Sequence, residues 1–323
     1  MNKKHRIPMP GHPHERREAL PWQHPKATEE DPEALRRVQA ILNSPSYRRA
    51  DNDINFLARD GVRGVRLQID YLKPELLLEE HEIHQTIVVF GSTRICEPAA
   101  ARRKVEALRT SLSADRSNME LRRRLAIAER IQAKSHYYEV AREFGRLVGG
   151  ANHGARKHTV IITGGGPGMM EAANRGAFDV GAKSVGLNIS LPHEQYPNPY
   201  VTPELCFSFH YFALRKLHFL LRAKALVAFP GGYGTFDELF ELLTLSQTGK
   251  TARIPIVLVD QDYWRKVIDW RALQEHGMVS AEDLGLLEFA HNGADAWAIL
   301  KQAGIGAAPG AALEVNNFPL GGA

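Results

Sequence analysis

Three glycine-rich turns have the residue types and spacing that phosphate binding requires. Their sequences are GST at residues 91–93, GGGPG at 164–168 and PGGYGT at 230–235. Glycine lets the backbone approach a phosphate closely, and a helix that follows such a turn aims free N–H groups at the anion. Each turn alone could be an ordinary tight connection between a strand and a helix. Together, at one edge of a sheet, they predict a site for a phosphorylated ligand.

The spacing of these glycines argues against several familiar sites. The G-x-x-x-x-G-K-[ST] pattern of P-loop nucleoside triphosphatases is absent. Gly164, Gly166 and Gly168 lack the G-x-G-x-x-G spacing, and the following strand ends at 187–189 without the acidic residue that would hold the ribose of NAD. The G-x-S-x-G turn of α/β-hydrolases is also missing.

Charged side chains directly follow the last of the three turns. Asp237 and Glu238 come next in the sequence, and Glu241 lies about one helical turn further on. Thr235 and Glu238 match the capping box [ST]-x-x-[DE], which gives the glutamate a purely structural interpretation. A carboxylate beside a phosphate-binding turn is also what a site needs if the carboxylate faces the sugar of the ligand. The spacing leaves both interpretations open.

An Arg215–Lys216 pair lies in a predicted helix over residues 211–223. Such a pair also occurs on the solvated face of a surface helix. The functional interpretation places Arg215 in the cleft, where its guanidinium orients a carboxylate and the sugar.

The elements that must position these residues are alternating strands and helices. Strands are predicted over 86–90, 159–163, 184–189, 205–209, 225–229 and 254–259, and helices over 98–148 with a hairpin turn near 115–118, 168–180, 211–223, 236–248 and 262–275. Short apolar runs that end in glycine are typical of buried parallel strands. The fold class predicted is α/β, a Rossmann-like doubly wound parallel sheet in which the three turns meet at the carboxyl edge.

The chain is predicted to have four segments. Residues 1–30 form a mobile arm rich in Pro and His, and residues 31–83 form a helical extension that begins at an Asp31-Pro32 helix start. Residues 84–304 form the Rossmann-like nucleotide-binding catalytic domain, with a helical insertion at about 98–135. Residues 305–323 form a loose tail.

The composition is typical of a globular cytoplasmic protein. The hydrophobic fraction is 44%, no apolar run is long enough for a membrane span, and the basic N-terminus lacks the apolar stretch of a signal peptide. Two isolated cysteines give no disulfide framework or CxxC metal site, and no metal or cofactor is expected. Residues 102–134 carry ten Lys or Arg against four Asp or Glu. This insertion either presents a solvated face or attracts nucleic acid, and the first interpretation is favoured.

Residues 230–238 (PGGYGTFDE) resemble the PGGxGTxxE signature of the LONELY GUY (LOG) phosphoribohydrolases. Residues 163–177 are similar to the glycine loop and following helix of that family, and Arg215-Lys216 matches its Arg-Lys pair. The resemblance covers about residues 84–275. The long N-terminal helices and the basic insertion depart from the family pattern. The family has also carried the label lysine decarboxylase, but no lysine here lies in a recognisable pyridoxal phosphate setting.

The resemblance implies hydrolysis of a nucleoside 5′-monophosphate, AMP or a cytokinin nucleotide, to free base and ribose 5-phosphate by a homo-oligomer. It implies that Arg215 and Glu238 are catalytic. With the glycine turns, it implies that the substrate contacts Gly91, Ser92, Gly165, Gly166, Glu194, Lys216, Gly231, Gly232, Tyr233, Gly234, Thr235, Asp237 and Thr244.

The implied mechanism centres on a cationic ribose. Glu238 would stabilise an oxocarbenium-like transition state and assist the attacking water, while Arg215 would hold Glu238 and the sugar hydroxyls. The helix start near residues 234–235 would bind the 5′-phosphate. Two alternatives remain open: a nucleotide-binding sensor without turnover, and a nucleic-acid-associated protein that uses residues 102–134.

Overall fold

The computed structural model describes residues 26–151, 159–191 and 196–306. The chain divides into two compact units, one ending at Arg66 and the other starting at Leu67. This division lies inside helix α3 (Arg63–Glu80), so the α/β unit begins earlier than the expected residue 84. Glu194 and most of the predicted arm and tail lie outside the described residues.

The described residues of the first unit form short helices. They are α1 (Ala34–Leu42), η3 (Pro45–Tyr47), η4 (Ala50–Asn52), α2 (Ile54–Leu57) and η5 (Asp60–Val62). The predicted helix start at Asp31-Pro32 is wrong, because α1 begins at Ala34. The Asp31 carboxylate instead accepts a hydrogen bond from the Glu33 amide (3.0 Å), just before the helix.

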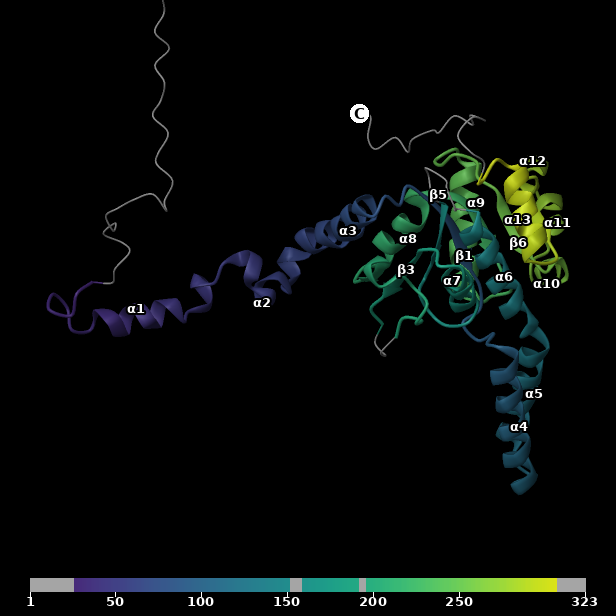
Figure 1. The fold of residues 1–323 in the computed structure, drawn as a ribbon, viewed down its shortest axis with the longest axis horizontal. Coiled ribbons are helices and arrows are strands. Elements are labelled where there is room, and N and C mark those ends of the chain that lie inside the picture. The colour runs from purple at the N-terminus through teal and green to yellow at the C-terminus, as the bar shows by residue number, and fades with distance from the viewer. Residues whose placement is uncertain (1–25, 152–158, 192–195, 307–323) are drawn as a thin grey trace, which may run out of the picture. The chain divides into compact units, whose positions relative to one another are not determined.

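The described residues of the second unit form a seven-stranded parallel sheet in the order β4-β3-β2-β1-β5-β6-β7 (Figure 1). The strands are β1 (Gln85–Phe90), β2 (Thr159–Thr163), β3 (Ser184–Ile189), β4 (Cys206–Phe209), β5 (Ala223–Ala228), β6 (Ile256–Val259) and β7 (Leu287–Ala290). The predicted doubly wound α/β fold is confirmed. β7 was not predicted, since it is a four-residue edge strand that includes the exposed Glu288.

The second unit also contains helices, most of which cover the two faces of this sheet. They are α4 (Pro98–Ala114), α5 (Met119–Lys134), α6 (His136–Gly150), α7 (Met169–Asp179), α8 (Phe212–Leu221), α9 (Tyr233–Gln247), α10 (Gln261–Val267), α11 (Trp270–Glu275), α12 (Ala281–Leu284) and α13 (Gly293–Gln302), with a short η6 (Pro203–Leu205). The single helix predicted over 262–275 is two helices. The second starts at Trp270 and is capped by Asp269, whose carboxylate accepts a hydrogen bond from the Ala272 amide (3.0 Å).

Alternation along the strands sorts the apolar side chains into two cores. In β1, Val88 and Phe90 join the core beneath α8, α9 and α10, while Ile87 and Val89 join the core beneath α6, α7 and α13. Successive residues of a strand point to opposite faces, so a strand covered on both faces is apolar throughout. This explains why the strands read as continuous apolar runs in the sequence.

The strand order reverses between β1 and β5, and this switch point brings the glycine turns together. The Ser92 amide donates to the Pro230 carbonyl (2.9 Å), and the Met169 amide donates to the Ser92 carbonyl (3.1 Å). The turns after β1, β2 and β5 are thereby joined at the carboxyl edge of the sheet. Open α/β sheets bind ligands at such a switch point.

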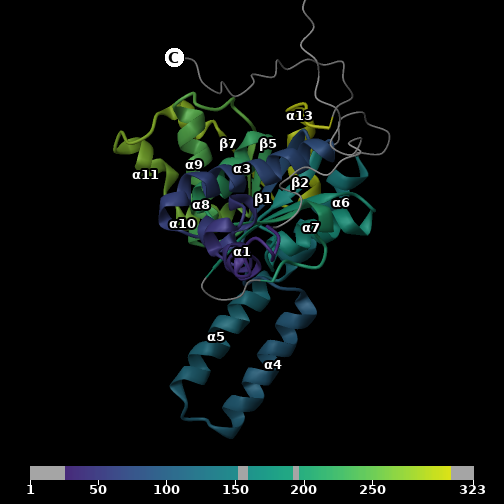
Figure 2. The ribbon, with the colours of Figure 1, turned by 90° about the vertical axis from the view of Figure 1, so that its left-hand side faces the viewer.

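The predicted helical insertion is a hairpin of α4 and α5, which run side by side (Figure 2). Val105 and Leu108 of α4 pack against Ala128 of α5, and Leu121 and Leu125 border this small core. The side chain of Asn118 caps α5 by accepting a hydrogen bond from the Leu121 amide (3.0 Å).

Gly176→Ala tests the close packing of α6 on α7. A Cβ at residue 176 would lie 2.0 Å from the Arg142 carbonyl oxygen. We expect the variant to lose about 1–3 kcal/mol of unfolding free energy, measured by urea denaturation, because overpacking forces the backbones apart. Gly64→Ala, where a Cβ meets nothing within 4 Å, is the helical control and should keep the wild-type stability or gain up to about 1 kcal/mol from the higher helix propensity of alanine. Equal stability of Gly176→Ala and the wild type would contradict the packing.

Candidate active site

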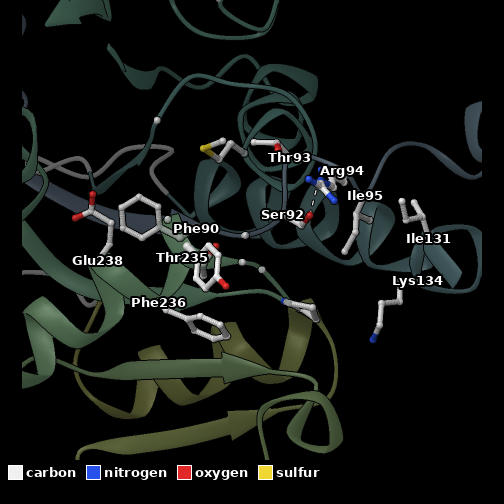
Figure 3. Close-up of a pocket in the computed structure, with 18 of the residues that line it drawn as sticks. Phe90, Ser92, Thr93, Arg94, Ile95, Ile131, Lys134, Thr235, Phe236 and Glu238 are labelled. Atoms are coloured by element: carbon white, nitrogen blue, oxygen red, sulfur yellow. Dashed lines mark hydrogen bonds between the residues drawn. The ribbon is translucent and has the colours of Figure 1, made fainter. Parts of the chain in front are cut away.

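A cavity of about 840 Å³ opens at the switch point of the second unit. Its walls come from the turns after β1 and β5, the first turns of α9, and parts of α8 and α5 (Figure 3). The volume falls within the range of roughly 300–1,000 Å³ that is usual for small-molecule sites.

Glu238, on α9, is a buried carboxylate in this cavity. Only 5% of its side-chain surface is exposed, and no described residue donates a hydrogen bond to it. Burial raises the pKa of the Glu238 carboxyl to about 7, although the charges of Lys216 and Arg215 act in the opposite direction. A carboxyl group that titrates near neutral pH is suited to proton transfer.

Arg215, on α8, faces Glu238 across the cavity. Its Nη2 lies 3.8 Å from Glu238 Oε1, which is too long for a direct hydrogen bond. The guanidinium lies over the rings of Phe212 and Phe219, 4.9 and 5.7 Å from their centroids. Its buried Nε has no hydrogen-bond partner among the residues that the structure describes. The two opposite charges are therefore close, held by packing, and still able to bind polar groups of a ligand.

The capping-box interpretation of Thr235 and Glu238 is wrong. Helix α9 begins at Tyr233 with Gly232 as its N-cap, and no side chain caps it. Thr235 is therefore the third residue of the helix and Glu238 the sixth. The glycine turn enters the helix earlier than the sequence pattern suggests, and this frees the glutamate from a role at the helix start.

The turn at residues 231–234 has two kinds of glycine. A Cβ at Gly231 would lie 2.0 Å from Thr235 Oγ1, so packing within the turn requires this glycine. A Cβ at Gly232 or Gly234 would meet nothing within 4 Å, and neither residue has a positive φ. No protein contact requires these two glycines, and both line the cavity. They leave open the space around the first amides of α9, which have no acceptor within the helix.

The turn after β1 lies beside the turn at residues 231–234 and is fixed by its own contacts. A Cβ at Gly91 would lie 2.6 Å from Met169 Cβ and 2.9 Å from Phe229 Cβ. Ser92 Oγ accepts a hydrogen bond from the Arg94 amide (3.1 Å) (Figure 3). Gly91 and Ser92 therefore form a rigid wall of the cavity.

The turn after β2 supports the site without surrounding it. The Gly165 carbonyl accepts a hydrogen bond from the Asn198 amide (2.8 Å), and the Gly166 carbonyl accepts one from Asn198 Nδ2 (3.1 Å). Both glycines are buried and neither lines the cavity, which Gly164 and Met170 reach instead.

The cavity brings together most of the residues predicted for the site. It is lined by Gly91, Ser92, Arg215, Gly231, Gly232, Tyr233, Gly234, Thr235 and Glu238. It is not lined by Gly165, Gly166, Lys216, Asp237 and Thr244.

Lys216 and Asp237 join α8 to α9 at the edge of the cavity. Lys216 Nζ lies 2.8 Å from Asp237 Oδ1 and 3.2 Å from Glu241 Oε2. Thr244 is exposed, and its hydroxyl donates to the Phe240 carbonyl (2.7 Å). Six residues after Glu238, it points roughly 120° away around the helix.

Sequence reasoning missed the wall that α5 contributes. Ile127, Arg130, Ile131 and Lys134 line the cavity, at the i, i+3, i+4 and i+7 spacing of one helix face. Leu121, Leu125 and Ala128 form the other apolar face, toward α4. The sequence signal that could have revealed this wall is the presence of two apolar faces on one predicted helix, since each apolar face needs its own packing partner.

Within the described ranges, no helix is both long and apolar enough to cross a membrane. In the same ranges, no three His, Cys, Asp or Glu side chains converge on a point where they could hold a metal ion.

The doubly wound sheet, with glycine turns and a buried Glu–Arg pair at its switch point, defines an α/β protein with a small-molecule site. Residues 170–300 match the family model described as "Possible lysine decarboxylase". "Cytokinin riboside 5′-monophosphate phosphoribohydrolase LOG3" of Arabidopsis thaliana is 28% identical over 153 residues, which are 46% of this chain and 66% of that protein. The rice (Oryza sativa subsp. japonica) protein of this activity, LOG, is 30% identical over 132 residues, 40% of this chain and 50% of that protein.

Over these segments the chain is similar to LOG phosphoribohydrolases. The chain spans between 49% and 66% of the length of the curated relatives that it matches. A solved structural-genomics protein, TM1055, superposes with a TM-score of 0.39 at 18% identity, over 68% of this chain and 99% of that one.

Glu238→Gln should stabilise the fold in a pH-dependent way. The folded carboxyl has a pKa of about 7 against an ordinary value of 4.5, so the native state binds more protons between these values and loses stability as pH rises. At pH 8 the neutral amide should raise Tm by at least about 2–4 °C, the shift that 1 kcal/mol produces in a domain of this size. At pH 5, where the wild-type carboxyl is protonated, the difference should shrink.

Calorimetry at both pH values measures these shifts. Glu106→Gln is the control, since Glu106 is exposed on α4 and its carboxylate has no partner among the described residues. A Glu238→Gln variant that is less stable than the wild type at pH 8 would refute the desolvation of the carboxylate.

Proposed function

We propose that this protein hydrolyses the N-glycosidic bond of a nucleoside 5′-monophosphate, with AMP as a substrate, to free base and ribose 5-phosphate. The observation that carries the proposal is the buried Glu238 carboxyl, which shares one cavity with Arg215 and an open glycine turn. The phosphoribohydrolase activity in the names of the relatives supports the same reaction.

The glycine turn suits the 5′-phosphate. The α9 amides at Tyr233 and Gly234 have no acceptor within the helix, and the positive end of the helix dipole lies at the same place. Ser92, in the adjacent turn after β1, has a hydroxyl that a phosphate oxygen could contact. Binding energy at the phosphate, remote from the bond that breaks, would hold the sugar in place for reaction.

Glu238 suits the sugar rather than the phosphate. It lies on the same helix as the turn and, unlike the turn amides, carries negative charge. Cleavage of the bond between C1′ and the base nitrogen develops positive charge on the ribose, and an ionised carboxylate in a poorly solvated site stabilises that charge strongly. The same carboxylate can accept a proton from the attacking water, because its pKa of about 7 lies near working pH.

Arg215 positions these groups. With its Nη2 3.8 Å from Glu238 Oε1 and a buried, unpartnered Nε, it can donate to ribose hydroxyls while keeping Glu238 ionised. In the reaction the water oxygen bonds to C1′ as the C1′–N bond breaks. One water hydrogen stays on the new hydroxyl, and the other reaches the departing base by way of Glu238.

Glu238→Gln should abolish base release while the protein stays folded. We expect the rate of adenine formation from AMP to fall by about 100- to 10,000-fold, the usual contribution of a positioned acid or base. The measurement is a panel of nucleoside monophosphates, with free base and ribose 5-phosphate separated by chromatography. Glu106→Gln, on the exposed face of α4, should retain wild-type rates.

Normal turnover by Glu238→Gln would remove this residue from the mechanism. Wild-type protein that binds nucleotides and leaves them intact would contradict the proposed reaction and favour a sensor.

Gly234→Ala should weaken phosphate binding without harming the fold. The added methyl meets no protein atom within 4 Å, and alanine favours the helix by about 1 kcal/mol over glycine. It would occupy the space left for the phosphate, so KM for AMP should rise about tenfold, the effect of losing about 1.4 kcal/mol of binding. Steady-state kinetics and thermal denaturation check both parts. An unchanged KM would place the phosphate elsewhere.

A further inference from the structure

The α4–α5 hairpin gives one of its faces to the cavity and thereby adds cationic groups to it. Arg130 lies between Ile127 and Ile131 on the cavity face of α5, and Arg94 follows the turn after β1. The basic insertion was expected from its composition to present a solvated face. In the structure, its α5 helix also contributes to the candidate active site.

The Arg94 and Arg130 side chains have no ionic partner. Neither guanidinium makes a hydrogen bond or ion pair with any residue in the described ranges, and both side chains belong to exposed residues on the cavity wall. Unpaired guanidiniums in a cavity are ready to bind an anion, and their planar donor groups match the oxygens of a phosphate.

Lys134 differs from these two residues. Its Nζ lies 3.5 Å from Asp260 Oδ2 and 4.9 Å from the centroid of the Tyr263 ring. The Tyr263 hydroxyl in turn donates to the Gly231 carbonyl. The charge of Lys134 is thus paired with Asp260, and through Tyr263 this lysine connects the end of α5 to the turn at residues 231–234.

Arg94, Lys134 and the α5 wall that carries Arg130 lie on the side of the cavity away from the carboxylate. Figure 3 shows Arg94, Ile131 and Lys134 on one side and Glu238 on the other, with Ser92 and Thr235 between them. A nucleotide with its ribose at Glu238 and its 5′-phosphate at residues 231–235 would direct any further phosphate toward the guanidiniums.

We propose that Arg94 and Arg130 form a second anion subsite, which takes the β-phosphate of a nucleoside 5′-diphosphate. The inference rests on the placement of sugar and phosphate under the proposed function. The hairpin makes the cavity longer than a monophosphate requires, and nucleoside diphosphates compete with monophosphates for it.

Calorimetric titration of ADP and AMP into the full-length protein tests the subsite. Wild-type protein should bind ADP about tenfold more tightly than AMP, the gain from about 1.4 kcal/mol of added charge-assisted contacts. Arg94→Gln and Arg130→Gln should each reduce that preference, with ADP affinity falling much more than AMP affinity. Arg124→Gln, on the exposed part of the same helix and outside the cavity, is the matched control and should keep the full preference.

Three results would overturn the subsite. The first is equal affinity of the wild type for ADP and AMP. The second is an equal loss of affinity for both nucleotides in the arginine variants, which would place the guanidiniums at the phosphate that AMP and ADP share. The third is no binding of either nucleotide. Failure of the proposed reaction looks different: both nucleotides bind with the expected preference, but no adenine is released from AMP.

Discussion

The burial of the Glu238 carboxyl is the physical constraint on which the rest of the site depends. A carboxylate that is 5% exposed, accepts no hydrogen bond from a described residue and lies 3.8 Å from the nearest guanidinium is poorly stabilised, and its pKa rises to about 7. A fold keeps such a group only where the surrounding structure holds it in place. Here the core beneath α8, α9 and α10 positions α8 and α9, and the pairing of Lys216 with Asp237 and Glu241 fixes these two helices to each other.

One helix connects the two ends of the proposed chemistry. α9 begins at the open turn of Gly232 and Gly234, which suits an anion, and reaches Glu238 within two helical turns. The distance between phosphate and carboxylate is therefore set by a rigid element rather than by loops, which favours a fixed geometry at the sugar. The hairpin closes the cavity from the other side, and the pairing of Lys134 with Asp260 anchors it there.

Short apolar runs bounded by turn residues were sufficient to predict every strand of the described sheet except β7, because strands buried on both faces are mostly apolar. The parallel order then predicted that the turns after β1 and β5 meet. The support role of Gly165 and Gly166 could not be predicted, since it depends on Asn198, more than 30 residues away. The capping box misled because a short pattern does not determine where a helix starts. The α5 wall was missed because charged residues dominate the composition of its segment. The predicted helical extension, residues 31–83, wrongly included residues 67–83, since Leu78 and Ile83 belong to the core of the sheet.

Direct titration of the Glu238 carboxyl tests the central claim most closely. In protein labelled with ¹³C at the glutamate side-chain carboxyl, the resonance that disappears in Glu238→Gln reports this one group. The structure predicts a titration midpoint near pH 7, about where burial places the pKa. A midpoint near the ordinary glutamate value of 4.5 would show that the carboxylate is well solvated or hydrogen-bonded, and would contradict the account.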